Sequence, residues 1–420
     1  MDNPLKKYAT QCRAVLETTT IGPDGPGTIR TDVETLMTFI GETGIVTGSV
    51  HGNLPADVLP EISGRLAAPL EVALKRALLR DYPNIAGVFV LLRVMGLAEV
   101  KDGRVRINMA ALGRLRVLNL TEQYLALLEA WLLLADEKVL GGAEWREAQQ
   151  FEDNVSFLAK LPSSKWKEFH FASRAFSLWS APCTWNTQLH ARFGLIEIGA
   201  LPVGDRSRVG RGWLLGKARV TPWGRAVAWA IIESLGVKEG FRLVELPEDE
   251  QAGFGTLHRA FGGFFAEWRT CFAAATTEAR TGIHLFKVTM SDRRADGVVW
   301  RRLAVPHDFS LDSLADAVLD AFGFSDREHL YNFTYRDASG RGREYAHPYD
   351  EEAAEFAGDI AVGELGLPEK GVIKFRFDYG ASWRFELKLE RIDAPGGPRT
   401  PVKVLATVGK APQQYSTERW

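Results

Sequence analysis

Residues 372–390 are VIKFRFDYGASWRFELKLE, and this segment is the most informative about the fold of the C-terminal part of the chain. Apolar and polar side chains alternate on both sides of a short turn at residues 380–382. Phe375 and Phe377 fall on one face, together with Trp383 across the turn. A period of two is the pattern of a half-buried strand. The stretch therefore predicts an antiparallel hairpin with Trp383 on its buried face.

The sequence before this hairpin predicts more strands and one amphipathic helix. The helix is expected over LDSLADAVLDAFGF (311–324), where apolar residues recur at helical spacing and Ser310 is the N-cap. Strand patterns are present in IHLFKVTM (283–290), VVWRRLAVP (298–306) and HLYNFTYRD (329–337). The order strand-strand-helix-strand-strand-strand is typical of a β-grasp-like α+β domain, which we expect over residues 282–420.

These segments resemble the plasmid pRiA4b ORF-3-like family, also described as the insertion-element passenger TnpR-like domain. The resemblance is carried by VWRRLAVP, SLDSLADAVLDAFGF, HLYNF and FRFDYGASWRFELKLERI, which follow one another in this order. It covers roughly residues 282–412, about a third of the chain. It implies an α+β domain found on plasmids, transposons and bacterial chromosomes, and it implies no established biochemical activity.

The family hairpin commonly has the motif Asp-Phe-Gly-Asp-x-Trp-x-His. Asp378, Gly380 and Trp383 match it, whereas Ala381 and Phe385 stand in place of the second acid and the histidine. We therefore interpret the three matching residues as structural. Trp383 is expected in the core, Asp378 is expected to stabilise the turn, and Gly380 is expected to supply a positive φ there.

The N-terminal two thirds of the chain are predicted to be mainly helical. After an N-terminal arm (1–34), helices are expected from about residue 35, over LAAPLEVALKRALLRDYP (66–83) and from Asn84 to Gly96. LAEVKDGRVRINM (97–109) then predicts a hairpin, because Asp-Gly joins two strand-like runs. Helices closed by such a hairpin suggest a winged-helix-like domain over residues 35–140.

Residues 141–260 follow a similar plan and predict a second winged-helix-like domain. In this part, LIEIGALPVGDRSRVGRGWLLGKARVTP (195–222) suggests two strands around a tip rich in glycine and arginine. Thr221 and Pro222 predict the start of a helix. A linker helix over residues 261–281 is expected before the C-terminal domain. A buried connecting helix capped by Thr121 is expected over residues 121–140.

Charge is distributed unevenly along a chain whose formal net charge is −2. Residues 65–120 hold ten basic and four acidic side chains, and residues 192–225 hold seven and two. Attraction to phosphate requires locally positive charge and not a positive total. The residues predicted to contact nucleic acid are Arg93, Lys101, Arg104, Arg106, Arg206, Arg208, Arg211, Lys217 and Arg219. The alternative is that these arginine-rich turns are only solvated surface.

The sequence shows no pattern typical of a known catalytic or metal site. The eight histidines form no HExxH motif, and GxSxG and phosphate-loop motifs are absent. The three cysteines lie far apart, which predicts a reducing cytoplasm and no cysteine-based zinc site. No run of 18 apolar residues occurs, so no membrane segment is expected. We therefore predict no catalytic residue, metal or cofactor.

Three functions remain open. We favour a non-enzymatic accessory or regulatory protein of a mobile-element or defence context that binds double-stranded DNA. In this hypothesis the helices after Pro83 and around residues 185–192 enter major grooves, while the arginines of the wings hold phosphates. The second possibility is a protein-interaction adaptor that binds its partner through residues 282–420. The third and least favoured is a metal-dependent nuclease or hydrolase.

Overall fold

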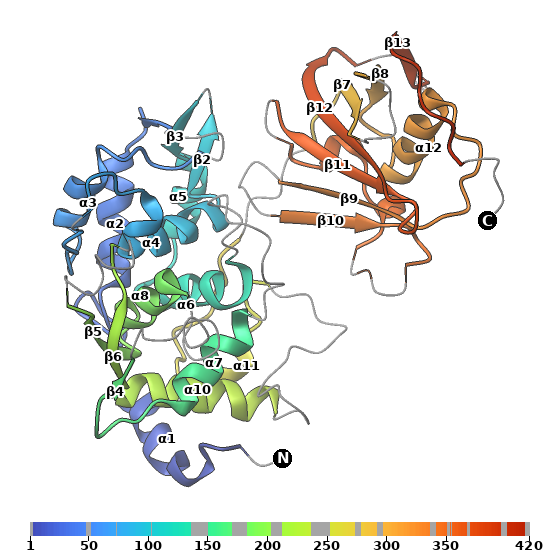
Figure 1. Ribbon diagram of the computed structural model, residues 1–420. Helices are drawn as coiled ribbons and strands as arrows, with labels where there is room; N and C mark the ends of the chain where they lie inside the picture. The colour runs from blue at the N-terminus through green and yellow to red at the C-terminus, as the bar shows by residue number, and fades with distance from the viewer. Residues whose placement is uncertain are drawn as a thin grey trace. The chain divides into compact units, whose positions relative to one another are not determined.

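The computed structural model describes residues 3–47, 52–72, 74–101, 103–135, 150–169, 183–202, 212–236, 253–273, 279–291, 297–336, 342–350, 353, 355–367, 370–395 and 401–415. The chain divides into two compact units, Met1–Ala275 and Thr276–Trp420, and each is described by itself (Figure 1). Each unit has its own hydrophobic core. The mixed helix and strand content agrees with the predicted α+β class.

The first half of the N-terminal unit combines helices with a small three-stranded sheet. Its elements are α1 (Ala9–Thr18), α2 (Ile29–Ile40), β1 (Ile45–Val46), α3 (Leu59–Arg65), α4 (Pro83–Val94), β2 (Ala98–Lys101) and β3 (Arg104–Ile107). The three strands are antiparallel in the order β1-β3-β2. Strands β2 and β3 form the hairpin that the Asp-Gly dipeptide predicts.

The second half of this unit arranges its strands in the same way. Its elements are α5 (Met109–Arg116), α6 (Leu120–Glu129), a π-helical turn (Ala130–Leu134), α7 (Gln150–Lys160), β4 (Lys167–Glu168), α8 (Thr184–Arg192), β5 (Ile196–Ala200), β6 (Leu215–Val220), α10 (Pro222–Leu235) and α11 (His258–Phe261). The strands are antiparallel in the order β4-β6-β5. The predicted start of α10 is confirmed, because the Thr221 hydroxyl accepts a hydrogen bond from the Gly224 amide at 2.9 Å.

Helices α4 and α8 pack against each other inside the unit. Every residue of α4 is buried, and a Cβ atom on its Gly87 would lie 2.9 Å from Leu189 of α8. A buried ion pair between Asp32 of α2 and Arg192 of α8, at 3.4 Å, joins the two halves. The segments predicted as two domains therefore share one core.

Two predicted helices are wrong, and a third has a different cap. In place of a helix over 66–83, α3 ends at Arg65, and the following chain is held by side chains, with the Ala67 amide bonded to Asp32. The linker helix predicted over 261–281 is not observed. Helix α11 ends at Phe261, and the described residues 262–273 and 279–281 form no further helix. Helix α6 is capped by Asn119, not Thr121, with Glu122 completing a capping box.

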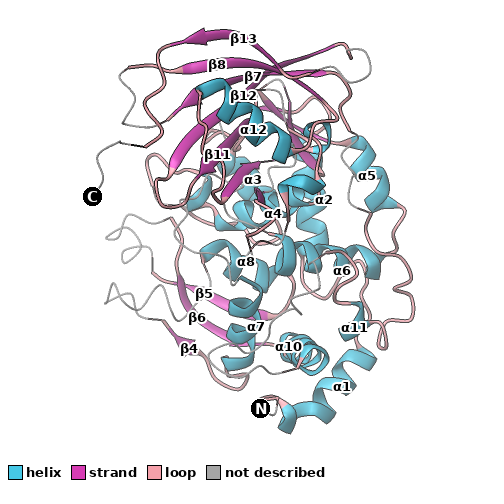
Figure 2. Ribbon diagram, turned by 90° about the vertical axis from the view of Figure 1, so that its right-hand side faces the viewer, coloured by secondary structure: helices cyan, strands magenta, loops and turns pink. Residues whose placement is uncertain are grey.

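The C-terminal unit is built on one large antiparallel sheet with a helix on one face (Figure 2). Its elements are β7 (Ile283–Met290), β8 (Trp300–Pro306), α12 (Leu311–Phe322), β9 (Tyr331–Arg336), β10 (Gly342–Ala346), β11 (Val372–Phe377), β12 (Trp383–Asp393) and β13 (Lys403–Val408). Within the described part, seven strands follow the order β10-β9-β11-β12-β7-β8-β13. Strands β10 and β13 lie at the two edges, and neither is among the strands predicted from the sequence.

The predicted hairpin and its buried face are confirmed. Phe377 pairs with Trp383, and Phe375 pairs with Phe385. Trp383 is 1% exposed, and its ring packs on Phe324 with the centroids 4.8 Å apart. Helix α12 is capped by the Ser310 hydroxyl, as expected, and contributes its apolar face to the same core.

Candidate nucleic-acid interface

The first basic group lies on the β2–β3 hairpin. Lys101 is exposed at the end of β2, and Arg104 and Arg106 are half-buried on β3. The Arg104 guanidinium donates to the carbonyl oxygens of Thr43 and Gly44 at 2.9 and 2.6 Å. Arg104 therefore fastens the hairpin to the loop before β1, and Lys101 is the most accessible cation of this group.

Arg93 does not belong to this surface. Its side chain lies at the end of the buried helix α4 and is 4% exposed. The guanidinium lies over the Phe89 ring, 5.8 Å from the centroid. In the folded unit, α4 and α8 are used for packing and leave no free face for a DNA groove, contrary to the role predicted for them.

The second basic group surrounds a tryptophan on the β4–β6–β5 sheet. Lys217 and Arg219 alternate along β6, and each places its charge 4.8 Å from the centroid of the Trp166 ring. Arg219 also forms an exposed ion pair with Glu197 on β5. The predicted contacts Arg206, Arg208 and Arg211 lie outside the described residues. Trp166 is not among the predicted contacts, although its position between Lys165 and Lys167 is a signal for a basic aromatic site.

The two basic groups occupy different places on the N-terminal unit. The β2–β3 hairpin and the β4–β6–β5 sheet are clearly separated in Figure 1. The half-buried and exposed cations of the two groups can attract phosphate, and the accessible part of Trp166 can contact a sugar or a base.

The family motif of the C-terminal unit forms a compact polar cluster at the β11–β12 turn. Asp378 accepts hydrogen bonds from the amides of Gly380 and Ala381 at 3.0 and 3.1 Å, and from the Tyr415 hydroxyl at 2.7 Å. His329 Nδ1 lies 4.0 Å from the same carboxylate. Burial opposes ionisation of Asp378, but these hydrogen bonds and the histidine outweigh it and lower its pKa. The carboxylate stabilises the turn by accepting these hydrogen bonds, which is the role expected for it.

The role predicted for Gly380 is wrong. The left-handed residues of this turn are Asp378 and Ser382, with φ values of 55° and 53°, and Gly380 has no positive φ. Asp can adopt this conformation because its short side chain bonds to the local backbone. Tyr415, which ties the end of the chain to the turn, was not identified from the sequence.

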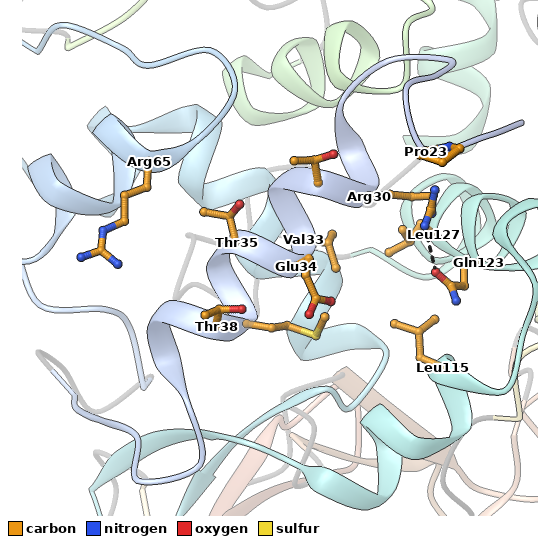
Figure 3. A pocket seen from close by; sticks show the side chains of 12 residues that line it. Pro23, Arg30, Val33, Glu34, Thr35, Thr38, Arg65, Leu115, Gln123 and Leu127 are labelled. Carbon is orange, nitrogen blue, oxygen red and sulfur yellow. Dashed lines mark hydrogen bonds between the residues drawn. The ribbon is translucent and has the colours of Figure 1, made fainter.

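A pocket of about 540 Å³ runs along α2 (Figure 3). Arg30 points toward Gln123 of α6 at 3.5 Å and donates to the Gly22 carbonyl oxygen at 3.0 Å. Leu127 lies near Arg30 and Gln123, and Leu115 also lines the pocket. The only acidic side chain in the lining, Glu34, lies 3.5 Å from Arg116.

The described residues hold no group of three or more histidine, cysteine, aspartate or glutamate side chains suited to a metal ion. Among the helices in the described ranges, none is long and apolar enough to cross a membrane.

Comparison with known proteins addresses the C-terminal unit. Residues 283–415 match the sequence model of the plasmid pRiA4b ORF-3-like protein family. The predicted relationship of this third of the chain is thereby confirmed. A solved protein of unknown function from Methanosarcina mazei Go1 is similar at 16% identity, with a TM-score of 0.28, over 32% of this chain and 75% of that one. No curated protein matches.

Proposed function

We propose that the protein binds double-stranded DNA through its N-terminal unit, as an accessory or regulatory protein of a mobile-element or defence context. The observation that carries this proposal is the recurrence of one arrangement in both halves. Helices α2, α3 and α4 with strands β1, β2 and β3 match the order expected of a winged helix, and the described elements α7, β4, α8, β5 and β6 match it with one helix fewer. In each half the basic side chains lie on the strands at the wing.

The burial of α4 and α8 limits how this unit can contact DNA. Winged-helix proteins commonly insert the third helix into the major groove, but here both corresponding helices are covered. We therefore assign the DNA contacts to the wings. Lys101 lies on the wing of the first half, and Lys217 and Arg219 lie on the wing of the second half. Contacts of this kind go mainly to phosphate, so the expected binding is strongly salt-dependent and weakly sequence-specific.

For the C-terminal unit we retain the β-grasp-like description as an interpretation. Helix α12 lies on one face of the sheet, and the first and last long strands, β7 and β12, are central neighbours. These two strands are antiparallel, which sets the unit apart from the usual arrangement of a β-grasp sheet.

The first prediction tests the wings by charge reversal. The double variant Lys101→Glu/Lys217→Glu should bind a short DNA duplex at least about tenfold more weakly and lower the slope of log affinity against log salt by about two. Fluorescence anisotropy at several salt concentrations measures both quantities. Arg327→Glu, a single charge reversal on the C-terminal unit, is the control and should leave duplex affinity unchanged. Absence of duplex binding by the unmodified protein at low salt would exclude the proposed function.

An adaptor role is the second candidate, and edge strand β13 favours it. Val404 and Leu405 are each about half exposed on this strand, and Val408 is 42% exposed. Exposed apolar edge strands can pair with a strand of a partner. The adaptor hypothesis predicts that Leu405→Lys abolishes binding of a specific protein partner. It also predicts that the wing substitutions leave duplex binding unchanged.

A further inference from the structure

The two faces of the seven-stranded sheet differ in charge. One face carries the apolar core and α12, whose exposed side includes Asp312, Asp316 and Asp320 and no basic residue. On the other face, the alternate residues of β11 and β12 are exposed. This second surface is called the open face below. Within the described part, its charged residues are the bases Lys287, Arg302, Lys374, Arg376, Arg384, Lys388, Arg391 and Lys403 and the acids Glu344, Glu386, Glu390 and Asp393.

Several of these bases lie directly opposite one another across neighbouring strands. Arg376 of β11 faces Arg384 of β12. In another row, Lys287 of β7 lies between Lys388 of β12 and Arg302 of β8. Like charges at directly opposed positions destabilise a sheet. A ligand with closely spaced negative charges would offset this repulsion, so the pattern points to a polyanion.

A tryptophan lies beside this row of cations. Trp300 of β8 is half-buried and faces Thr289 on β7, two residues along each strand from Lys287 and Arg302. The Lys287 ammonium lies 5.0 Å from the centroid of the ring, and the Arg302 guanidinium lies 5.6 Å from it. Arg302 also bonds to Glu390 at 2.7 and 3.1 Å, which holds its guanidinium in place.

Cations next to an aromatic ring on an open surface are the elements that bind single-stranded nucleic acid. The cations follow the backbone, and the ring stacks on a base. A duplex offers phosphates but keeps its bases paired, so the tryptophan favours a single strand. We propose that the open face binds single-stranded nucleic acid, with phosphates along Lys287, Lys388, Arg376 and Arg384 and a base stacked on Trp300. This site is additional to the proposed duplex interface of the N-terminal unit.

The second prediction is measured on the full chain with a fluorescein-labelled single strand of about 20 thymidines, long enough to span one binding face. Lys388→Glu should weaken binding about tenfold and reduce the salt slope by about 0.7 or more, because one phosphate contact is lost. Trp300→Ala should weaken binding about 5- to 150-fold, the range for one base–aromatic stack. Trp300→Phe retains an aromatic surface and should lose less.

The thermal unfolding midpoint distinguishes a variant that loses the binding site from a variant that loses its fold. Lys388→Glu replaces a like-charge pair with an opposite-charge pair beside Lys287, so its thermal unfolding midpoint should stay equal or rise while binding falls. Arg327→Glu is the matched control, since it makes the same charge change beside α12, where Arg327 bonds to Asp316 and Asp320. It should leave single-strand binding within about twofold of the unmodified protein.

The wing substitutions test whether the two sites are independent. Lys101→Glu/Lys217→Glu should weaken duplex binding only, and Lys388→Glu should weaken single-strand binding only. Several results would overturn the inference. These are no binding of the single strand by the unmodified protein, an unchanged single-strand affinity in Lys388→Glu, an equal loss of single-strand affinity in Arg327→Glu, or a loss of single-strand affinity in the wing variant alone. Loss of duplex binding in Lys388→Glu would likewise overturn the assignment to a single strand. The first three of these results do not depend on whether the wings bind DNA.

Discussion

At the scale of single residues, Glu129 is the clearest example of a charge that serves structure. It lies at the end of α6, is 1% exposed, and accepts hydrogen bonds from the Gly255 and Leu257 amides at 2.8 to 2.9 Å. Burial raises its pKa to about 7, although these hydrogen bonds oppose the shift. The carboxylate holds the segment before α11 against α6, and its place in the apolar run LALLEAWLLL is a sequence signal for a buried acid.

The third prediction concerns the pH dependence of stability. Between the ordinary glutamate pKa and about 7, Glu129 binds a proton in the folded state but not in the unfolded state. Its contribution to stability is therefore greatest at low pH and falls as pH rises through 7, by an amount on the order of 3 kcal/mol. Urea unfolding at pH 5 and pH 8 measures this change. Glu129→Gln cannot ionise and should show a smaller loss over the same interval, whereas equal losses in both proteins would contradict the assignment.

At the scale of elements, the sequence was most informative where apolar residues have a single clear period. The β11–β12 hairpin and α12 were predicted nearly to the residue, because one face of each is wholly apolar. The predicted helix over 66–83 failed, because long-range bonds from Asp32 and Arg192 hold residues 67 and 68 and compete with helix formation. The basic wing residues could be found as charge clusters, but the burial of Arg93 depends on the packing of α4, which no local pattern reveals.

The fourth prediction concerns the turn between β11 and β12. Asp378→Ala should destabilise the C-terminal unit by about 1–3 kcal/mol, since it removes the acceptor for two amides and for the Tyr415 hydroxyl and strains a left-handed backbone. Asp378→Asn keeps a side-chain oxygen and tolerates this conformation, so it should cost less. Chemical unfolding of both variants measures the difference. Because the pKa of Asp378 is lowered, the stabilisation it provides is present near neutral pH and is lost in acid as the folded-state pKa is passed.

At the scale of the whole molecule, the two separate cores predict two units that unfold separately. Trp383 fills the centre of the C-terminal core, where its ring contacts Phe324, and truncation of a buried aromatic side chain typically costs about 3–5 kcal/mol. The fifth prediction is that Trp383→Ala unfolds residues 276–420 and leaves the unit of residues 1–275 folded. Limited proteolysis should then yield a stable fragment that ends near residue 275. Trp383→Phe retains most of the buried area and should protect the C-terminal unit in the same assay. A C-terminal fragment of Trp383→Ala as resistant as that of the unmodified protein would contradict its place in the core, and simultaneous loss of both units would show that the two cores depend on each other.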